Sequence, residues 1–110
     1  MDLPGLDRWP GKVVEAEIRR RYNSPVTFDP SLSAREFFLV VSVGRCKYSL
    51  TEFSVASILQ SVIGGLPDAF CIHFLGDRVF CFSVHSQDIG FHIYRLRSFE
   101  CANFKIFFHL

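Results

Sequence analysis

The chain has 110 residues, of which 49% are hydrophobic and 13 are Phe. This length suits one domain with one core, and the hydrophobic content excludes an intrinsically disordered chain. The 12 Lys and Arg residues nearly balance the 11 Asp and Glu residues, giving a net charge of +1. Such a balance excludes the strongly basic field of a non-specific nucleic-acid binder.

Neither end of the chain shows a membrane or secretion signal. No apolar run reaches the roughly 18 residues that a membrane-spanning helix needs. The first 11 residues are polar and contain Pro4 and Pro10, so they do not form a signal peptide. We therefore expect a soluble intracellular protein, in the cytoplasm or the nucleus. The chain stops on an apolar strand pattern without a polar tail, which predicts that it is cut from a longer protein.

Residues 1–34 differ in pattern from the rest and are predicted to form an N-terminal extension to a domain at residues 35–110. Within the extension, Val14, Ile18 and Tyr22 are spaced by four. That spacing predicts a short amphipathic helix over residues 12–22, after a leader of turn residues. Residues 23–33 contain Pro25 and Pro30 among Ser, Asn and Asp, which predicts an irregular linker.

Residues 35–110 alternate between strand and helix patterns. Aromatic and β-branched runs predict strands at residues 37–43, 70–75, 79–85 and 103–110. A first helix is expected over residues 51–63, capped by Thr51 and stopped by Gly64 and Gly65. A second helix is expected over residues 87–96, capped by Ser86. The order βαββαβ predicts an α+β, ferredoxin-like sandwich like that of RNA-recognition motifs, with a four-stranded antiparallel sheet in the order 4-1-3-2 and both helices on one face.

Facing residues on paired strands fix the predicted core. An odd-numbered loop at residues 76–78 aligns Phe74 with Phe80, so that alternate residues of both strands share one face. The residues predicted to lie in the core are Ile58, Leu59, Ile72, Phe74, Phe80, Phe82, Ile106 and Phe108.

The opposite face of the predicted sheet is half apolar, whereas an uncovered antiparallel face is usually polar. Such a patch typically marks a contact with another chain or with a covering segment. Residues 1–34, including Trp9, are one candidate cover, and a second copy of the chain is the other. Edge pairing through the second or fourth strand is a further route. We expect a homodimer because the linker at residues 23–33 is too irregular to dock firmly. The predicted interface residues are Phe38, Val40, Leu75, Val79 and Phe107.

Two features bear on nucleic-acid binding. Residues 78–82 resemble the basic and aromatic signature of the third strand of RNA-recognition motifs, but the phase places Phe80 and Phe82 in the core, not on the stacking face. Basic residues in loops and helices predict weak, sequence-tolerant contacts with the phosphates of single-stranded RNA or DNA, unless they are only solvated surface charges. These residues are Arg19, Arg20, Arg21, Arg45, Lys47 and Arg78.

Catalytic and metal-binding patterns are weak. The sequence contains no Gly-rich phosphate loop, nucleophile elbow or His-Glu-x-x-His helix, so we expect no enzyme, no cofactor and no small-molecule substrate. His73 and Cys81 are predicted neighbours across strands, with Cys71 and His85 nearby. Ligands spread along flat strands are seldom tetrahedral, so no metal is expected. The cysteines are predicted to be buried thiols without disulfides.

The segments GRCKYSLTEFSVASILQSVIGG, GDRVFCFSVHSQDIGFHIYRLRSFEC and NFKIFFHL resemble a plant domain of unknown function that is common in grasses. That domain occurs in retroelement-derived, gag-like proteins, often upstream of a zinc knuckle. The resemblance runs from Phe38 to Leu110 and leaves out residues 1–35. It implies a nucleic-acid-associated or self-assembling role and transfers no catalytic or binding residue. A zinc knuckle is absent from this sequence.

Overall fold

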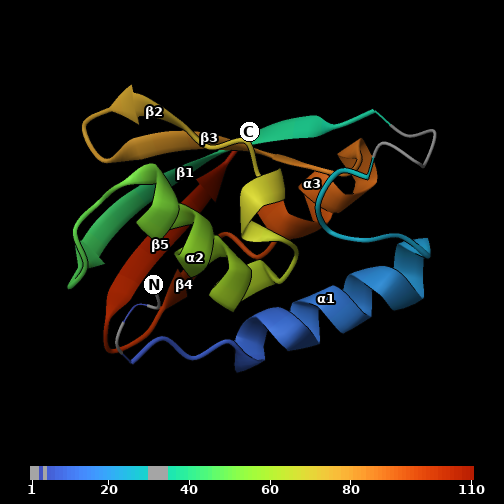
Figure 1. Ribbon diagram of the computed structural model, residues 1–110. Coiled ribbons are helices and arrows are strands. Elements are labelled where there is room, and N and C mark those ends of the chain that lie inside the picture. The colour runs from blue at the N-terminus through green and yellow to red at the C-terminus, as the bar shows by residue number, and fades with distance from the viewer. Residues whose placement is uncertain (1–2, 4, 30–34) are drawn as a thin grey trace.

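The computed structural model describes residues 3, 5–29 and 35–110. Within these residues, five antiparallel strands form one sheet in the order β2-β3-β1-β5-β4. Three helices accompany the sheet, as Figure 1 shows. No helix in this part of the chain has the length and apolar character needed to cross a membrane. The elements in chain order are α1 (Trp9–Tyr22), β1 (Phe37–Cys46), α2 (Glu52–Ile63), the short 3-10 helix η1 (Pro67–Ala69), β2 (His73–Gly76), β3 (Val79–Val84), α3 (Gln87–Tyr94), β4 (Ser98–Glu100) and β5 (Phe104–His109).

The four predicted strands are present in the predicted spatial order, and β4 adds a fifth strand beyond β5. The prediction of a four-stranded sheet was therefore wrong by one edge strand. The second predicted helix ends at Tyr94, and Arg97 then takes a left-handed φ of 66°. That turn directs Ser98–Glu100 back along β5, with Phe99 opposite Ile106. A strand of three residues is too short to show a period in the sequence.

Both predicted helix caps are confirmed. The Thr51 hydroxyl accepts a hydrogen bond from the Ser54 amide at 3.0 Å, and the Ser54 hydroxyl accepts one from the Thr51 amide at 2.8 Å. This reciprocal capping satisfies amides that the first turn of α2 leaves without partners. The Ser86 hydroxyl accepts from the Ile89 amide at the start of α3. Gly64 ends α2 with a φ of 77°, a conformation that glycine adopts without strain.

The hairpin between β2 and β3 differs from the predicted odd loop. Asp77 and Arg78 have φ values of 50° and 66°, which are typical of a two-residue turn that matches the strand twist. Gly76 therefore pairs with Val79, and a register shift at Leu75 restores the predicted pairing of Phe74 with Phe80. The predicted pairing of Phe74 with Phe80 is thus confirmed, and it depends on the irregularity at Leu75.

Strand β2 is shorter than predicted, and this changes the core. Cys71 has a φ of 53°, so the extended segment begins only at His73, while Phe70 turns inward and is fully buried. Phe74 is 60% exposed, and its predicted burial was wrong. As part of an edge strand, its ring contacts Phe80, with centroids 5.3 Å apart, and has no strand on its other side. Ile72 is half-buried, whereas Ile58, Leu59, Phe80, Phe82, Ile106 and Phe108 are buried as predicted.

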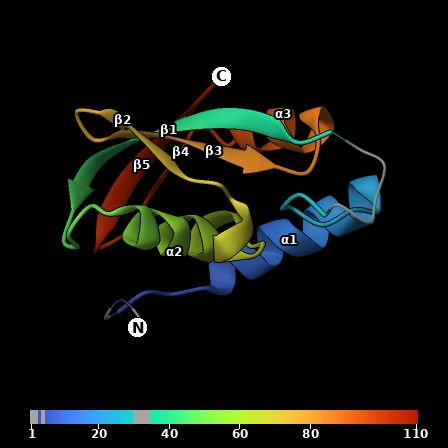
Figure 2. The ribbon, with the colours of Figure 1, turned by 45° about the horizontal axis from the view of Figure 1, so that its top comes forward.

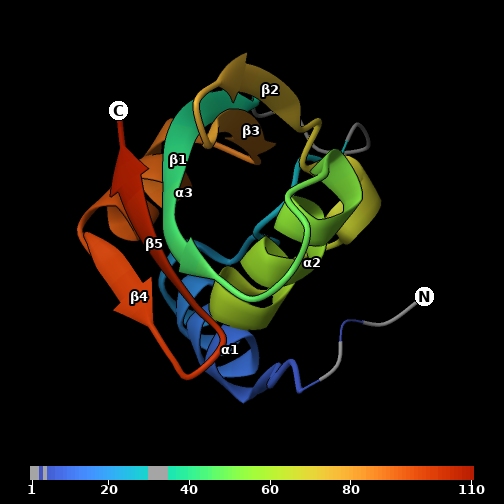
Figure 3. The same ribbon diagram turned by 90° about the vertical axis from the view of Figure 1, so that its left-hand side faces the viewer.

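Helix α1 starts at Trp9, earlier than predicted, because Pro10 stands in its first turn, where no amide donor is needed. Its Ile18 lies in the same buried cluster as the residues of β1 and α2. The strands curve around this cluster, and α1 and α2 occupy the concave side (Figure 3). Residues of α3 join the cluster through Ile89 and Ile93. All three helices thus cover one side of the sheet.

The segment after α1 docks onto the domain, contrary to the predicted loose linker. Val26 and Thr27 are buried, and the Val26 carbonyl accepts a hydrogen bond from the His85 amide at 2.8 Å. Residues 30–33 of the predicted linker lie outside the described residues.

Candidate binding surfaces

Residues 1–34 were a candidate cover for the half-apolar face of the sheet, but helix α1 does not lie on that face. Figure 2 shows α1 beside α2, with both helices on the same side of the sheet. The two helices touch closely, since a Cβ added at Gly11 would lie 2.1 Å from the Gln60 carbonyl oxygen. The other side of the sheet, called here the open face, stays uncovered by α1. The predicted interface residues lie on or beside it: Phe38 is 50% exposed, Leu75 is 57% exposed, and Val40, Val79 and Phe107 are partly exposed.

Strand pairing places apolar and polar residues in rows across the open face. Val79 is paired with Ser42, and Ser42 with Phe107. Polar groups at the β5 end bind their neighbours: the Ser42 hydroxyl lies 2.8 Å from His109 Nε2, and Lys105 Nζ lies 5.3 Å from the centre of the Phe107 ring. The face thus carries the apolar side chains of Val79 and Phe107 on either side of Ser42, whose hydroxyl already has a partner in His109.

At one end of the open face, Ser83, which pairs with Phe38, and His85, just after β3, are both buried. The Ser83 amide and hydroxyl both donate to the Phe70 carbonyl, at 2.6 and 3.1 Å. His85 Nδ1 accepts a hydrogen bond from the Asp29 amide at 3.4 Å. Neighbouring segments thus close this end of the open face and satisfy its polar groups.

Cys71, His73, Cys81 and His85 were considered as metal ligands. His73 faces Cys81 across β2 and β3, as predicted. Within the described residues, however, no three His, Cys, Asp or Glu side chains are placed to hold an ion. None of the four cysteines forms a disulfide. Their predicted burial was wrong, since Cys71 is exposed and the other three are half-buried.

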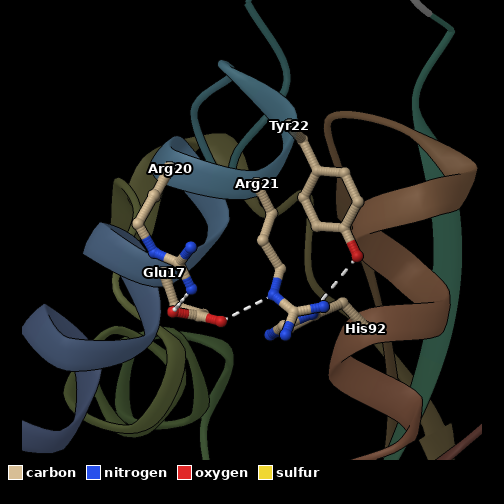
Figure 4. Close-up of polar contacts among 5 residues, drawn as sticks. All are labelled: Glu17, Arg20, Arg21, Tyr22 and His92. Atoms are coloured by element: carbon tan, nitrogen blue, oxygen red, sulfur yellow. Dashed lines mark hydrogen bonds and ion pairs between the residues drawn. The ribbon is translucent and has the colours of Figure 1, made fainter.

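The basic residues predicted to contact nucleic acid fall into two groups. The first group lies at the end of α1, where Arg20 and Arg21 bind the carboxylate of Glu17 at 2.7 and 2.6 Å (Figure 4). These hydrogen bonds lower the pKa of Glu17 below its usual value. Arg19 is exposed on the same turn. The single carboxylate of Glu17 thus offsets one of the two positive charges of Arg20 and Arg21.

The second group surrounds the end of β1. Arg45 donates to the carbonyls of Cys101 and Ala102 at 2.6 and 2.8 Å. Arg78 donates to the Val43 carbonyl at 2.9 Å and also to that of Gly44. Both guanidinium groups therefore fix backbone, a role that composition did not indicate. The exposed side chain of Lys47 lies just beyond. Figure 1 shows the ends of α1 and β1 at opposite ends of the molecule, so the structure does not unite the two groups.

A polar contact that the sequence did not single out joins α1 to α3. The Tyr22 hydroxyl lies 3.3 Å from His92 Nδ1, and the two rings meet edge to face with centroids 5.7 Å apart (Figure 4). Burial lowers the pKa of His92, and the nearby positive charge of Arg21 lowers it further. A neutral imidazole therefore fits this position, and the contact fixes the end of α1.

An apolar groove runs between α1 and β4. Its volume is about 330 Å³, and Trp9 and Val13 stand exposed beside it, at 68% and 53%. A smaller hollow of about 190 Å³ continues from it and shares Pro10 and Phe99. The groove was not predicted from the sequence because β4 was not predicted. The groove is lined by Pro10, Val13, Val14, Val62, Leu96, Ser98, Phe99 and Phe108.

No family model, curated protein or solved structure matches this chain.

Proposed function

We propose that this domain is a non-catalytic, intracellular assembly module that self-associates through the open face of its sheet. In this proposal the scaffold is a ferredoxin-like βαββαβ unit, built from β1, α2, β2, β3, α3 and β5 and extended by α1 and β4. The observation that carries the proposal is the position of α1. It packs on α2 and leaves the apolar side chains of Val40, Val79 and Phe107 on the open face partly exposed.

The apolar area of the open face sets the scale of the interaction. Burying about 400 Å² of apolar surface contributes about 10 kcal/mol at the usual coefficient. Association itself costs about 4–15 kcal/mol, so a stable contact must bury several hundred Å² of apolar surface. Two copies stacked by two-fold symmetry would do so, since each presents the same patch.

Val79 is the residue on which to test this contact, because it lies next to Ser42 in the middle of the face and is only partly exposed. Val79→Lys would place a charge in the contact, so light scattering at micromolar concentration should show a lower mass than for the wild type. Phe53→Lys is the matched control, since Phe53 is exposed on α2, which lies on the other side of the sheet from the open face. The control should keep the wild-type mass. A wild-type monomer, or an unchanged mass for Val79→Lys, would contradict the proposal.

A second candidate function is weak binding of single-stranded RNA or DNA, as the resemblance to gag-like plant proteins implies. The observation that favours it is the gathering of Arg45, Lys47 and Arg78 around the end of β1. Phosphate contacts impose a steep dependence of affinity on salt. Charge reversal of Lys47 tests the site, because Lys47, unlike Arg45 and Arg78, holds no carbonyl through its side chain in the described structure.

The Lys47→Glu variant should weaken binding to a single-stranded RNA equally on every sequence and reduce the salt slope by about one unit. Lys12→Glu, on the exposed surface of α1, is the control for the change in net charge. The same comparison applies to the other group, where reversal of Arg19, Arg20 and Arg21 should also weaken binding. No measurable binding near 50 mM salt would exclude this function.

A further inference from the structure

Strand β4 offers backbone groups to a new strand. The residues that flank it bind β5: the carbonyl of Arg97, just before β4, accepts from the Phe108 amide at 2.8 Å, and the amide of Cys101, just after β4, donates to the Phe104 carbonyl at 2.9 Å. Because antiparallel bonds alternate, the backbone groups of Ser98 and Glu100 point to the other side. The Ser98 amide donates to the Leu96 carbonyl. An outward edge therefore remains, made by the Ser98 carbonyl and by the amide and carbonyl of Glu100.

The apolar groove lies directly beside this edge. Phe99 pairs with Ile106, which is buried under the helices, so the Phe99 side chain is on the helix side of the sheet. There it lines the groove together with Val13 and Leu96. A strand added to β4 would place its residue opposite Phe99 over this groove, because facing residues share one side of a sheet. An added strand would therefore contact both the outward backbone groups of β4 and the apolar groove.

The charges at the two ends of the groove are opposite. Arg97 is exposed at the start of β4, and neither its guanidinium nor the exposed carboxylate of Asp7 has an ion pair within the described residues. Asp7 lines the smaller hollow next to Cys101, at the other end of β4. An edge with a cation at one end and an anion at the other is complementary to itself when two copies run antiparallel.

We infer that β4 pairs antiparallel with β4 of a second copy, around a two-fold axis that passes beside Phe99. In this register Ser98 faces the partner's Glu100, and each Glu100 amide donates to the Ser98 carbonyl across the axis. Arg97 then faces the partner's Cys101, next to the partner's Asp7. The two Phe99 rings meet over the grooves, where the exposed side chains of Trp9 and Val13 border the contact.

This contact goes beyond the proposed function because it uses an edge and not the open face. Each of the two contacts is two-fold symmetric, and a chain that carries two different two-fold contacts assembles beyond a dimer. The edge contact also continues the sheet from one copy into the next and keeps the open face available. The wild type should therefore exceed the mass of a dimer at micromolar concentration.

Glu100→Pro is the sharpest test of the edge contact. Proline removes the Glu100 amide, which has no partner within the described structure, and edge strands tolerate it. Glu100→Ala is the matched control, because it removes the same carboxylate and its exposed ion pairs with Arg45 and Lys105 but keeps the amide. Light scattering should show a dimer for Glu100→Pro and the wild-type mass for Glu100→Ala. Equal masses for both variants and the wild type would overturn the inference.

Combining this variant with Val79→Lys separates the two contacts. Each single variant should be a dimer, and the double variant a monomer. If Val79→Lys leaves the mass unchanged while Glu100→Pro lowers it, the edge contact stands and the open-face contact fails. The reverse pattern overturns the edge contact alone.

Two further measurements keep the inference testable if Glu100→Pro does not fold. In the wild type, hydrogen exchange at the Glu100 amide should slow as the protein concentration rises, and concentration-independent exchange would contradict the contact. Arg97→Glu and Asp7→Arg should each weaken the edge dimer, and the two changes together in one chain should restore it. A double variant as weak as the single variants would argue against the proposed register.

Discussion

Gly11→Ala tests the packing of α1 on α2, on which the open face depends. An added Cβ at this position would lie 2.1 Å from the Gln60 carbonyl oxygen and 2.8 Å from the Gly64 amide nitrogen. Favourable contacts between heavy atoms lie near 3.5 Å, so α1 would have to move away by more than about 1 Å. Both obstructing groups are backbone and cannot rotate away. The substitution therefore separates the two helices.

The expected cost is the balance of two effects. Alanine in place of glycine favours a helix by up to about 1 kcal/mol. Overpacking of a close contact costs about 1–3 kcal/mol, and more where the obstacle is backbone. Because the overlap at Gly11 is severe, we expect the free energy of unfolding to fall by about 2 kcal/mol net. For a domain of this size that corresponds to a fall in Tm of roughly 8 °C.

Thermal unfolding followed by circular dichroism measures the effect. Ala16→Gly, at an exposed position of the same helix, gives the propensity contribution alone, about 1 kcal/mol. If Gly11→Ala instead raises Tm, helix propensity alone decides the outcome and the close packing of α1 on α2 is refuted.

Three other outcomes follow from the structure. Phe82, which is fully buried between Phe70 and Phe108, should cost about 3–5 kcal/mol when changed to Ala, enough to unfold a domain of marginal stability in a denaturant titration; a loss below 1 kcal/mol would refute its central position. The folded-state pKa of His92 lies below its unfolded value, so its contribution to stability is complete above about pH 6.5 and is lost as pH falls through the folded pKa. His92→Gln should flatten this part of the Tm–pH profile, and an unchanged slope would show that another group titrates. Purified protein should contain no stoichiometric zinc, and a chelator should leave Tm unchanged; a fall of many degrees would identify a structural metal.

The sequence predicted those elements whose signals are local. Thr51 and Ser86 are caps that act within one turn, and both helices start where these residues indicate. The strand order followed from the alternation of helices and strands. The pairing of Phe74 with Phe80 was correct, but the burial of Phe74 was not, because burial at a sheet edge depends on what lies beyond it.

The candidate surfaces were harder to predict because they depend on contacts between distant segments. Arg45 was a candidate phosphate ligand by its charge, yet it holds carbonyls that lie more than 50 residues further along the chain. The groove requires β4, which is too short to produce a pattern. The close approach of α1 to α2 occurs at Gly11, and in the sequence a glycine indicates only a weak helix position. Pairings of this kind appear only once the chain is folded.

The mass of the full chain in solution tests the central claim, self-association, most directly. The monomer mass is 12.6 kDa. Light scattering at micromolar concentration should show a mass that rises with concentration and exceeds that of a dimer, and Val79→Lys should lower it. A mass of 12.6 kDa at every concentration would contradict both the open-face contact and the edge contact.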